Sequence, residues 1–171
     1  MASITSPAGR LQTLTAAFLT AAMAGVVGTA LAFEHIGGYI PCKLCLEQRI
    51  PYYIGAPLMV LALVSSTLRW PAWMTRGLLL VGGLLMVWGL YMGVFHSGVE
   101  WGWWPGPTDC GAVAAPANTG GKGVLDALNS FVPPACDKAA LRVLGLSFAG
   151  WNVIASLILA IVAFRGAFSK K

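Results

Sequence analysis

Cys42 and Cys45 form a Cys-x-x-Cys pair, and Arg49 follows four residues after Cys45. Such a pair can hold zinc, attach haem, form a structural disulfide or act as a redox dithiol. A c-type haem needs a histidine directly after the second cysteine, but Leu46 stands there. Haem attachment is therefore excluded, and the other uses depend on the remaining cysteines and on the elements that hold them.

The remaining cysteines, Cys110 and Cys136, have 25 residues between them. Structural zinc sites commonly combine two closely spaced pairs, so this spacing disfavours zinc and we expect no metal. A disulfide that closes only the Cys42–Cys45 turn would add little stability, because the entropic benefit grows with loop length. This favours a reactive dithiol over an inert disulfide. Four cysteines allow three pairings, and the spacing does not choose among them.

The elements that position these thiols are predicted to be membrane helices. The chain is 57% hydrophobic and only 10% charged, with a mean hydropathy of +0.75, whereas soluble domains carry about 25% charged residues. About 20 apolar residues span a bilayer as a helix. We therefore predict an all-α, four-transmembrane-helix bundle forming one membrane domain, residues 1–171. The four uncharged stretches are 11–33, 50–68, 77–95 and 143–164.

The first stretch has a competing interpretation as a cleaved signal peptide. Arg10 resembles a basic leader region, and the "ALA" at 30–32 resembles a cleavage site. The apolar run is longer than the 7–15 residues usual in such leaders, so we favour a span.

Charge predicts the orientation of the bundle. With four spans, both termini and the loop near 69–76 lie on one side, which holds six basic residues and no acid. All six acidic residues fall on the other side. Basic residues mark the cytoplasmic side, so we expect both termini to be cytoplasmic. The positive net charge then reflects topology and indicates no nucleic-acid partner. The six basic residues are Arg10, Arg69, Arg76, Arg165, Lys170 and Lys171.

All four cysteines lie in the two loops on the outward side, near 34–49 and 96–142. Thiols on an oxidising membrane face are expected to pair. Within the long loop, residues 124–132 alternate apolar and polar side chains. This pattern predicts a short interfacial helix lying on membrane lipid.

The Cys-x-x-Cys pair is placed to be reactive. The second helix is expected to begin near 45–50, where its N-terminus would stabilise a thiolate. Lys43 and Arg49 add positive charge. An interfacial thiolate beside an arginine suits a quinone, and His96 could line the same site. Arg49 could instead bind lipid phosphate, and His96 could simply face water. The tryptophans at 101–104 are expected to lie among lipid headgroups.

The chain resembles the disulfide bond formation protein B (DsbB) family of bacterial inner-membrane oxidoreductases. The resemblance rests on four spans, "CKLCLEQR" before the second span, "YMGVFHSGVEWGWWPGPTDC" after the third, and "GLSFAGWN" in the fourth. It covers nearly the whole chain. Lys43 departs from the apolar residues usual between the first two cysteines of this family.

The resemblance implies a two-disulfide relay on the periplasmic side. A reduced DsbA-like thioredoxin-fold partner attacks the Cys110–Cys136 disulfide at Cys110, and Cys136 then exchanges with Cys42. Cys45 then faces a quinone, ubiquinone or menaquinone, as a thiolate, and Arg49 holds the quinone near His96. This family keeps the bacterial periplasm oxidising.

Two other functions stay open. Vitamin K epoxide reductase-like enzymes perform similar chemistry with four helices, but their loop cysteines precede the Cys-x-x-Cys pair. A disulfide-stapled membrane scaffold without catalytic activity is the third possibility.

Overall fold

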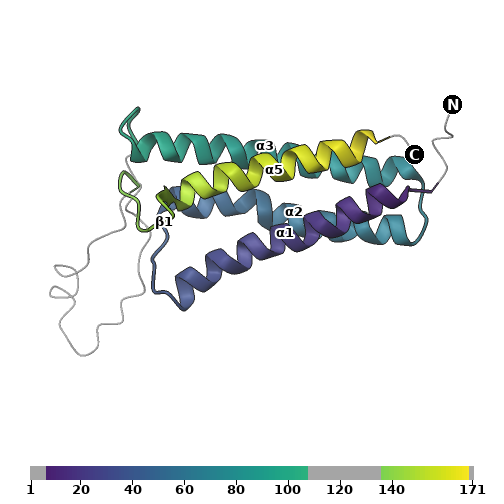
Figure 1. Cartoon of the computed structure of the whole chain (residues 1–171), viewed down its shortest axis with the longest axis horizontal. Coiled ribbons are helices and arrows are strands. Elements are labelled where there is room, and N and C mark those ends of the chain that lie inside the picture. The colour runs from purple at the N-terminus through teal and green to yellow at the C-terminus, as the bar shows by residue number, and fades with distance from the viewer. Residues whose placement is uncertain (1–6, 108–135, 170–171) are drawn as a thin grey trace.

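Four long helices dominate the computed structural model, which describes residues 7–107 and 136–169. They lie side by side and alternate in direction, so that the start of α1 and the end of α5 share one end of the bundle (Figure 1). This confirms the predicted all-helical, four-helix membrane bundle. The elements are α1 (Arg10–His35), α2 (Lys43–Thr67), α3 (Ala72–Glu100), β1 (Arg142–Val143), β2 (Leu146–Ser147) and α5 (Phe148–Phe168).

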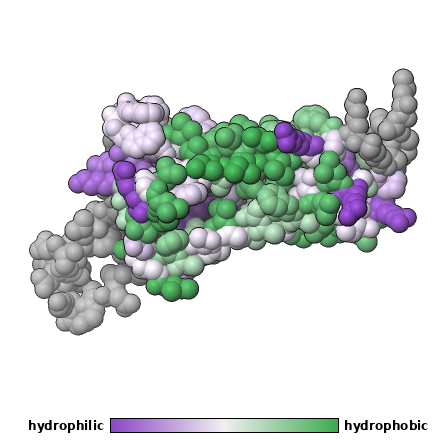
Figure 2. Space-filling view, viewed as in Figure 1, coloured by the Kyte–Doolittle hydropathy of each residue, from purple (hydrophilic) through white to green (hydrophobic). Residues whose placement is uncertain are grey.

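The outer surface of the bundle matches a lipid environment. Within the described residues, all four helices are long and apolar enough to cross a membrane. Large apolar side chains such as Leu84, Val60 and Ile158 are roughly half exposed. Figure 2 shows hydrophobic surface along the middle of the molecule and hydrophilic residues gathered toward its ends. The chain is therefore a multi-pass membrane protein.

Each helix packs against two neighbours, in the order α1, α2, α3, α5 around the bundle. The most extensive contact joins α3 to α5, and α1 barely meets α3 across the diagonal. Among the described residues that are fully buried in the core between them, Tyr52 is the one aromatic side chain, and the partly buried Phe164 packs against this core. Its largest buried members are Leu19, Met23, Tyr52, Met59, Leu79 and Met86.

Glycine lets α3 and α5 approach closely. A Cβ atom at Gly93 would lie 3.0 Å from the Val153 side chain and 3.2 Å from the Asn152 side-chain nitrogen. Small residues at membrane helix interfaces permit such contacts between backbones and side chains. Because of this approach, Asn152, near the start of α5, reaches the α3 backbone.

The observed helices differ from the uncharged stretches at their ends. α2 begins at Lys43, two turns before the expected span 50–68, so Pro51 lies within the helix and not in its first turn. Charged side chains near the end of a span can place their charged groups at the membrane interface. The length of an uncharged stretch is therefore shorter than the length of the helix that contains it.

The expected span 143–164 begins with a hairpin instead of a helix. Val143 pairs with Leu146, and the turn residues Leu144 and Gly145 both have positive φ, 53° and 85°. Two residues with positive φ are typical of tight hairpin turns. α5 then starts after Ser147, whose hydroxyl accepts the Gly150 backbone N–H at 3.2 Å.

The predicted interfacial helix at 124–132 lies outside the described residues.

Candidate active site

The Cys-x-x-Cys pair lies at the start of α2. This is the end of the bundle opposite the start of α1 and the end of α5 (Figure 1). Cys42 is the N-cap residue, and its Sγ accepts the Cys45 backbone N–H at 3.4 Å. Side-chain acceptors at this position satisfy one of the helix's free N–H groups. Both cysteines are free thiols, and a hydrogen bond of 3.0 Å joins their sulfurs. The helix start therefore aligns two thiols for closure into one disulfide.

The geometry separates the roles of the two thiols. The hydrogen bond from the Cys45 thiol lowers the pKa of Cys42 to about 4, assisted by His96 and the Cys45 backbone N–H and opposed by burial. These contacts favour ionisation at Cys42 over ionisation at Cys45. The family resemblance implied a thiolate at Cys45, whereas the contacts around the pair favour a thiolate at Cys42. The Cys45 side chain makes the largest contribution to this preference, followed by His96, and the N-cap contact with the Cys45 backbone N–H adds the least.

His96 lies on α3 beside this pair and is 3% exposed. Its Nε2 is 3.8 Å from Cys42 Sγ, and its Nδ1 is 2.5 Å from the side-chain nitrogen of Gln48. Gln48 in turn accepts a hydrogen bond of 2.8 Å from Asn152 on α5. The histidine predicted to line the site is thus buried against the reactive sulfur and held by side-chain amides from two other helices.

Glu100 is the second ionisable group buried near His96. Its Oε1 lies 3.8 Å from His96 Nε2, one helical turn away on α3, and its side chain is 4% exposed. Its Oε2 is buried and has no hydrogen-bond partner among the described residues. Unsatisfied buried oxygens are rare and require a physical explanation. This one leaves an acceptor position open beside the histidine.

Arg49 forms an ion pair with Glu34, the one acidic residue of α1. The two side chains are 14% and 25% exposed. Arg49 thus follows Cys45 by one turn of α2, and its charge is shared with a carboxylate. This pair also joins the end of α1 to the start of α2, next to the thiols.

Cys136 packs into the same small cluster as Cys42. It is 3% exposed and disulfide-bonded, and the cluster also contains Leu44 and Val99. Trp104 covers this cluster: its ring stacks on Phe95 at 6.0 Å, and its indole N–H donates to the Phe95 carbonyl at 2.9 Å. The chain thus brings a cysteine of the long loop to the Cys-x-x-Cys pair. Cys110 lies outside the described residues.

The tryptophans of the 101–104 segment divide into two groups. Trp101 and Trp103 are 53% and 65% exposed, as residues at the headgroup level would be. Trp104 instead folds back over α3, where the absence of a side chain at Gly98 makes room for its ring. The predicted headgroup role therefore fits the first two, while the third shields the cysteines.

Two cysteine sulfurs and one histidine nitrogen lie within 4.8 Å of one another, at Cys42, Cys45 and His96. Atoms of these kinds bind zinc, but a closed structural site uses four ligands. Among the described residues this is the one such grouping. Whether the histidine nitrogen could serve as a ligand depends on which ring nitrogen carries the proton.

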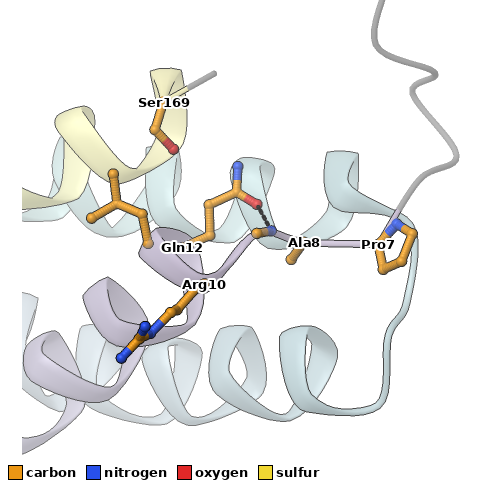
Figure 3. A pocket seen from close by; sticks show the side chains of 7 residues that line it. Pro7, Ala8, Arg10, Gln12 and Ser169 are labelled. Atoms are coloured by element: carbon orange, nitrogen blue, oxygen red, sulfur yellow. Dashed lines mark hydrogen bonds between the residues drawn. The ribbon is translucent and has the colours of Figure 1, made fainter. Parts of the chain in front are cut away.

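A shallow pocket lies at the opposite end of the bundle, between the start of α1 and the end of α5 (Figure 3). Gln12 closes one side of it by accepting the Gly9 backbone N–H at 3.1 Å, and Ser169 lies across from it. This is a helix-capping arrangement, remote from the cysteines.

Four polar residues of the site escaped the sequence analysis: Glu34, Gln48, Glu100 and Asn152. Each carries a weak signal. Glu100 is one turn from His96, and Gln48 and Asn152 are amides within or beside apolar stretches. Polar groups inside membrane spans are expensive and usually functional, which is the signal that could have found them.

Comparison with known sequences is consistent with this geometry. Residues 12–165, a range that includes all four cysteines, match a family described as disulfide bond formation protein DsbB. The chain is also similar to an uncharacterised protein, RP370, of Rickettsia prowazekii (strain Madrid E). The two are 25% identical over 136 residues, covering 79% of this chain and 76% of the relative. No solved structure matches the chain.

Proposed function

The chain belongs to the DsbB family of membrane disulfide oxidoreductases, and we propose that it re-oxidises a thioredoxin-like dithiol protein and passes the electrons to a membrane quinone. The family membership makes it a thiol oxidoreductase. The partner, the electron acceptor and the roles of individual residues are the proposal.

One observation carries it: two free thiols with their sulfurs 3.0 Å apart share a cluster with the disulfide-bonded Cys136. A relay between two disulfides needs this proximity, because exchange proceeds by attack of a thiolate on a disulfide sulfur. Cys42 packs with Cys136, and its stabilised thiolate makes it a good leaving group when a bond between Cys42 and Cys136 is resolved. An inert pair of disulfides would gain nothing from a stabilised thiolate.

The proposed cycle has three steps. The partner's dithiol attacks the Cys110–Cys136 disulfide at Cys110, so the partner is oxidised and the loop becomes a dithiol. Cys136 then attacks the Cys42–Cys45 disulfide at Cys42, and Cys110 resolves this bond, which restores the loop disulfide and leaves Cys42 and Cys45 reduced. Finally, two electrons and two protons pass to the quinone, giving quinol and re-forming Cys42–Cys45. Free Cys42 and Cys45 beside a disulfide-bonded Cys136 correspond to the state before this last step.

The quinone would supply the driving force, and Arg49 would hold it. The most oxidising dithiol partners have potentials of about −120 mV, so a thiol pair alone is a poor sink for their electrons. The guanidinium of Arg49 lies one turn from Cys45, where it could donate to a quinone oxygen. Its ion pair with Glu34 fixes its position, and His96 lies on the other side of the thiols.

We further propose that the cysteines face the periplasm of a bacterial inner membrane. The cysteine end of the bundle carries all the acidic residues of the described chain together with four basic ones, while the opposite end carries four arginines and no acid. Basic residues are enriched on the cytoplasmic side. The reactive pair would then open toward the oxidising compartment.

Purified protein in lipid nanodiscs tests the proposal. We expect quinone-dependent oxidation of a reduced thioredoxin-fold dithiol, followed through quinone absorbance. Cys45→Ser should abolish quinone reduction. Cys110→Ala should block oxidation of the partner but leave Cys42–Cys45 reducible by a small thiol. His35→Gln, at an exposed position, is the matched control and should retain activity. Wild-type protein without any quinone-dependent oxidation would indicate a scaffold, and a wild-type rate in Cys110→Ala would refute the order of the relay.

A further inference from the structure

A row of side-chain amides leads from the middle of the bundle to His96. It begins at the Gly89 backbone carbonyl of α3, which accepts a hydrogen bond of 3.2 Å from the Asn152 side-chain nitrogen. The same nitrogen donates to Gln48 Oε1 at 2.8 Å. The Gln48 nitrogen then lies 2.5 Å from His96 Nδ1. Three helices contribute to this row, and all of its members are buried or half-buried.

The first contact determines the direction of every later one. A backbone carbonyl can only accept, so the atom of Asn152 that faces Gly89 must be the amide nitrogen. The Tyr52 hydroxyl, which donates to Asn152 Oδ1 at 2.7 Å, agrees with this orientation. The second N–H of Asn152 then requires an acceptor, so Gln48 presents its oxygen to Asn152. Gln48 therefore presents its nitrogen, a donor, to the histidine.

A donor facing His96 Nδ1 requires that this nitrogen accept. In a neutral imidazole the other nitrogen then carries the proton. That nitrogen, Nε2, lies 3.8 Å from Cys42 Sγ and 3.8 Å from Glu100 Oε1, and both of these atoms are acceptors when ionised. The row of amides thus ends in an N–H that points at the reactive sulfur.

We propose that Gln48 and Asn152 are positioning residues that hold His96 in its Nε2–H form, so that the ring donates to the Cys42 sulfur and offers it no metal-binding lone pair. The chemical role of the arrangement rests on the proposed function, because a thiolate at Cys42 matters only in the relay. The tautomer itself does not depend on that function and can be measured separately.

This arrangement lowers the affinity for zinc of the site formed by Cys42, Cys45 and His96. Histidines that bind metals usually donate their second N–H to a carboxylate or carbonyl, which leaves the metal-facing nitrogen unprotonated. Here an amide N–H takes the place of that acceptor. The same three side chains would otherwise offer a thiophilic cation three ligands within 4.8 Å.

Nitrogen-15 NMR of histidine-labelled, fully reduced protein in nanodiscs tests the tautomer directly. His35→Gln leaves His96 as the single histidine, so its two ring nitrogens can be assigned. We expect Nε2 to carry the proton in this background. Gln48→Glu replaces the donor by a carboxylate and should move a proton to Nδ1. Asn152→Leu frees the Gln48 amide to rotate and should give a mixture of forms.

Ser156→Ala is the matched control. This hydroxyl contacts Tyr52 and Asn152 Oδ1 one turn along α5 but is not part of the row from Gly89 to His96. It should leave the tautomer unchanged. A protonated Nδ1 in the His35→Gln protein, or an unchanged Nε2–H form in Gln48→Glu, would overturn the proposal.

Zinc affinity provides a second measurement that requires no enzyme activity. Outer-shell partners of metal-bound histidine typically change metal affinity by about 10–100-fold. Competition against a zinc indicator should therefore show at least about tenfold tighter binding to reduced Gln48→Glu than to reduced wild type. Equal affinities would contradict the proposed role of Gln48. Loss of quinone activity with an intact Nε2–H signal would instead indicate failure of the proposed function alone.

Discussion

Removing the Cys45 thiol should raise the pKa of Cys42, and the size of this change can be derived from the structure. The Cys45 thiol is the main cause of the low pKa of Cys42, which is about 4. A hydrogen bond to a charged group contributes about 1.5–3 kcal/mol. At about 1.4 kcal/mol per pKa unit, Cys45→Ala should therefore raise the pKa by about 1–2 units. The Cys45 backbone N–H and the helix N-terminus remain in this variant.

Peptide-resolved alkylation of the reduced protein measures this change, because only the thiolate reacts. A pKa of about 4 leaves about 90% of Cys42 ionised at pH 5, whereas a rise of about 1–2 units leaves about 50% to 10%. Cys42 in Cys45→Ala should then be alkylated about two- to tenfold more slowly at pH 5. Near pH 8 Cys42 should react at similar rates in the two proteins, because its thiol is ionised in both. For wild type, the rate should fall only as the pH drops through about 4.

Cys45→Ser separates the hydrogen bond from the loss of packing. Its hydroxyl can still donate to the Cys42 sulfur, so its pH profile should lie closer to wild type than that of Cys45→Ala. Identical profiles for the two variants would show that the donor at position 45 does not lower the pKa, and the assignment of the thiolate to Cys42 would lose its main support.

Three further predictions concern the residues around the thiols. Arg49→Ala should raise the quinone KM without slowing exchange between the loop disulfide and the Cys-x-x-Cys pair, measured by stopped-flow; an unchanged KM would return Arg49 to a lipid-anchoring role. Gly98→Ala would place a Cβ 2.1 Å from the Trp104 ring, so thermal unfolding in detergent should show a loss of about 1–3 kcal/mol. Gly77→Ala, on the same helix with no atom within 4 Å, is its control and should be neutral or stabilising. Tyr52→Phe removes hydrogen bonds to two α5 side chains and should cost about 1–3 kcal/mol; no loss of stability would mean that these bonds contribute nothing net.

Local sequence patterns predicted the helices well because each span is a continuous apolar run. The ends of the helices were harder to predict, because an uncharged stretch and the helix that contains it begin and end at different residues. Lys43 and Arg49 interrupt the apolar run but not α2. At the start of α5 the opposite occurred: 143–147 is apolar enough to continue the span, yet the positive φ values of Leu144 and Gly145 turn it into a hairpin.

The site could be predicted only where its members are close in sequence. The Cys42–Cys45 spacing and the position of Arg49 one turn later follow from helical geometry. The contacts of His96 do not, because they join positions 48 and 96 to a residue more than 50 positions further along the chain. The thiolate expected at Cys45 was also the wrong choice, because the helix start favours ionisation of both thiols, while the contacts that favour Cys42 come from the Cys45 side chain and from His96 on another helix.

The hairpin before α5 also limits how far Cys136 can move. Six residue steps separate Cys136 from Arg142, where the hairpin begins, and an extended chain of this length reaches at most about 20 Å. A sulfur confined to a sphere of that radius has an effective concentration on the order of 50 mM toward a group inside it. Cys42 would therefore encounter this thiol at a concentration that no free protein in the surrounding compartment could match. Electrons that arrive at the loop would pass to Cys42 because the short tether keeps Cys136 near it, as well as because the Cys-x-x-Cys pair is reactive.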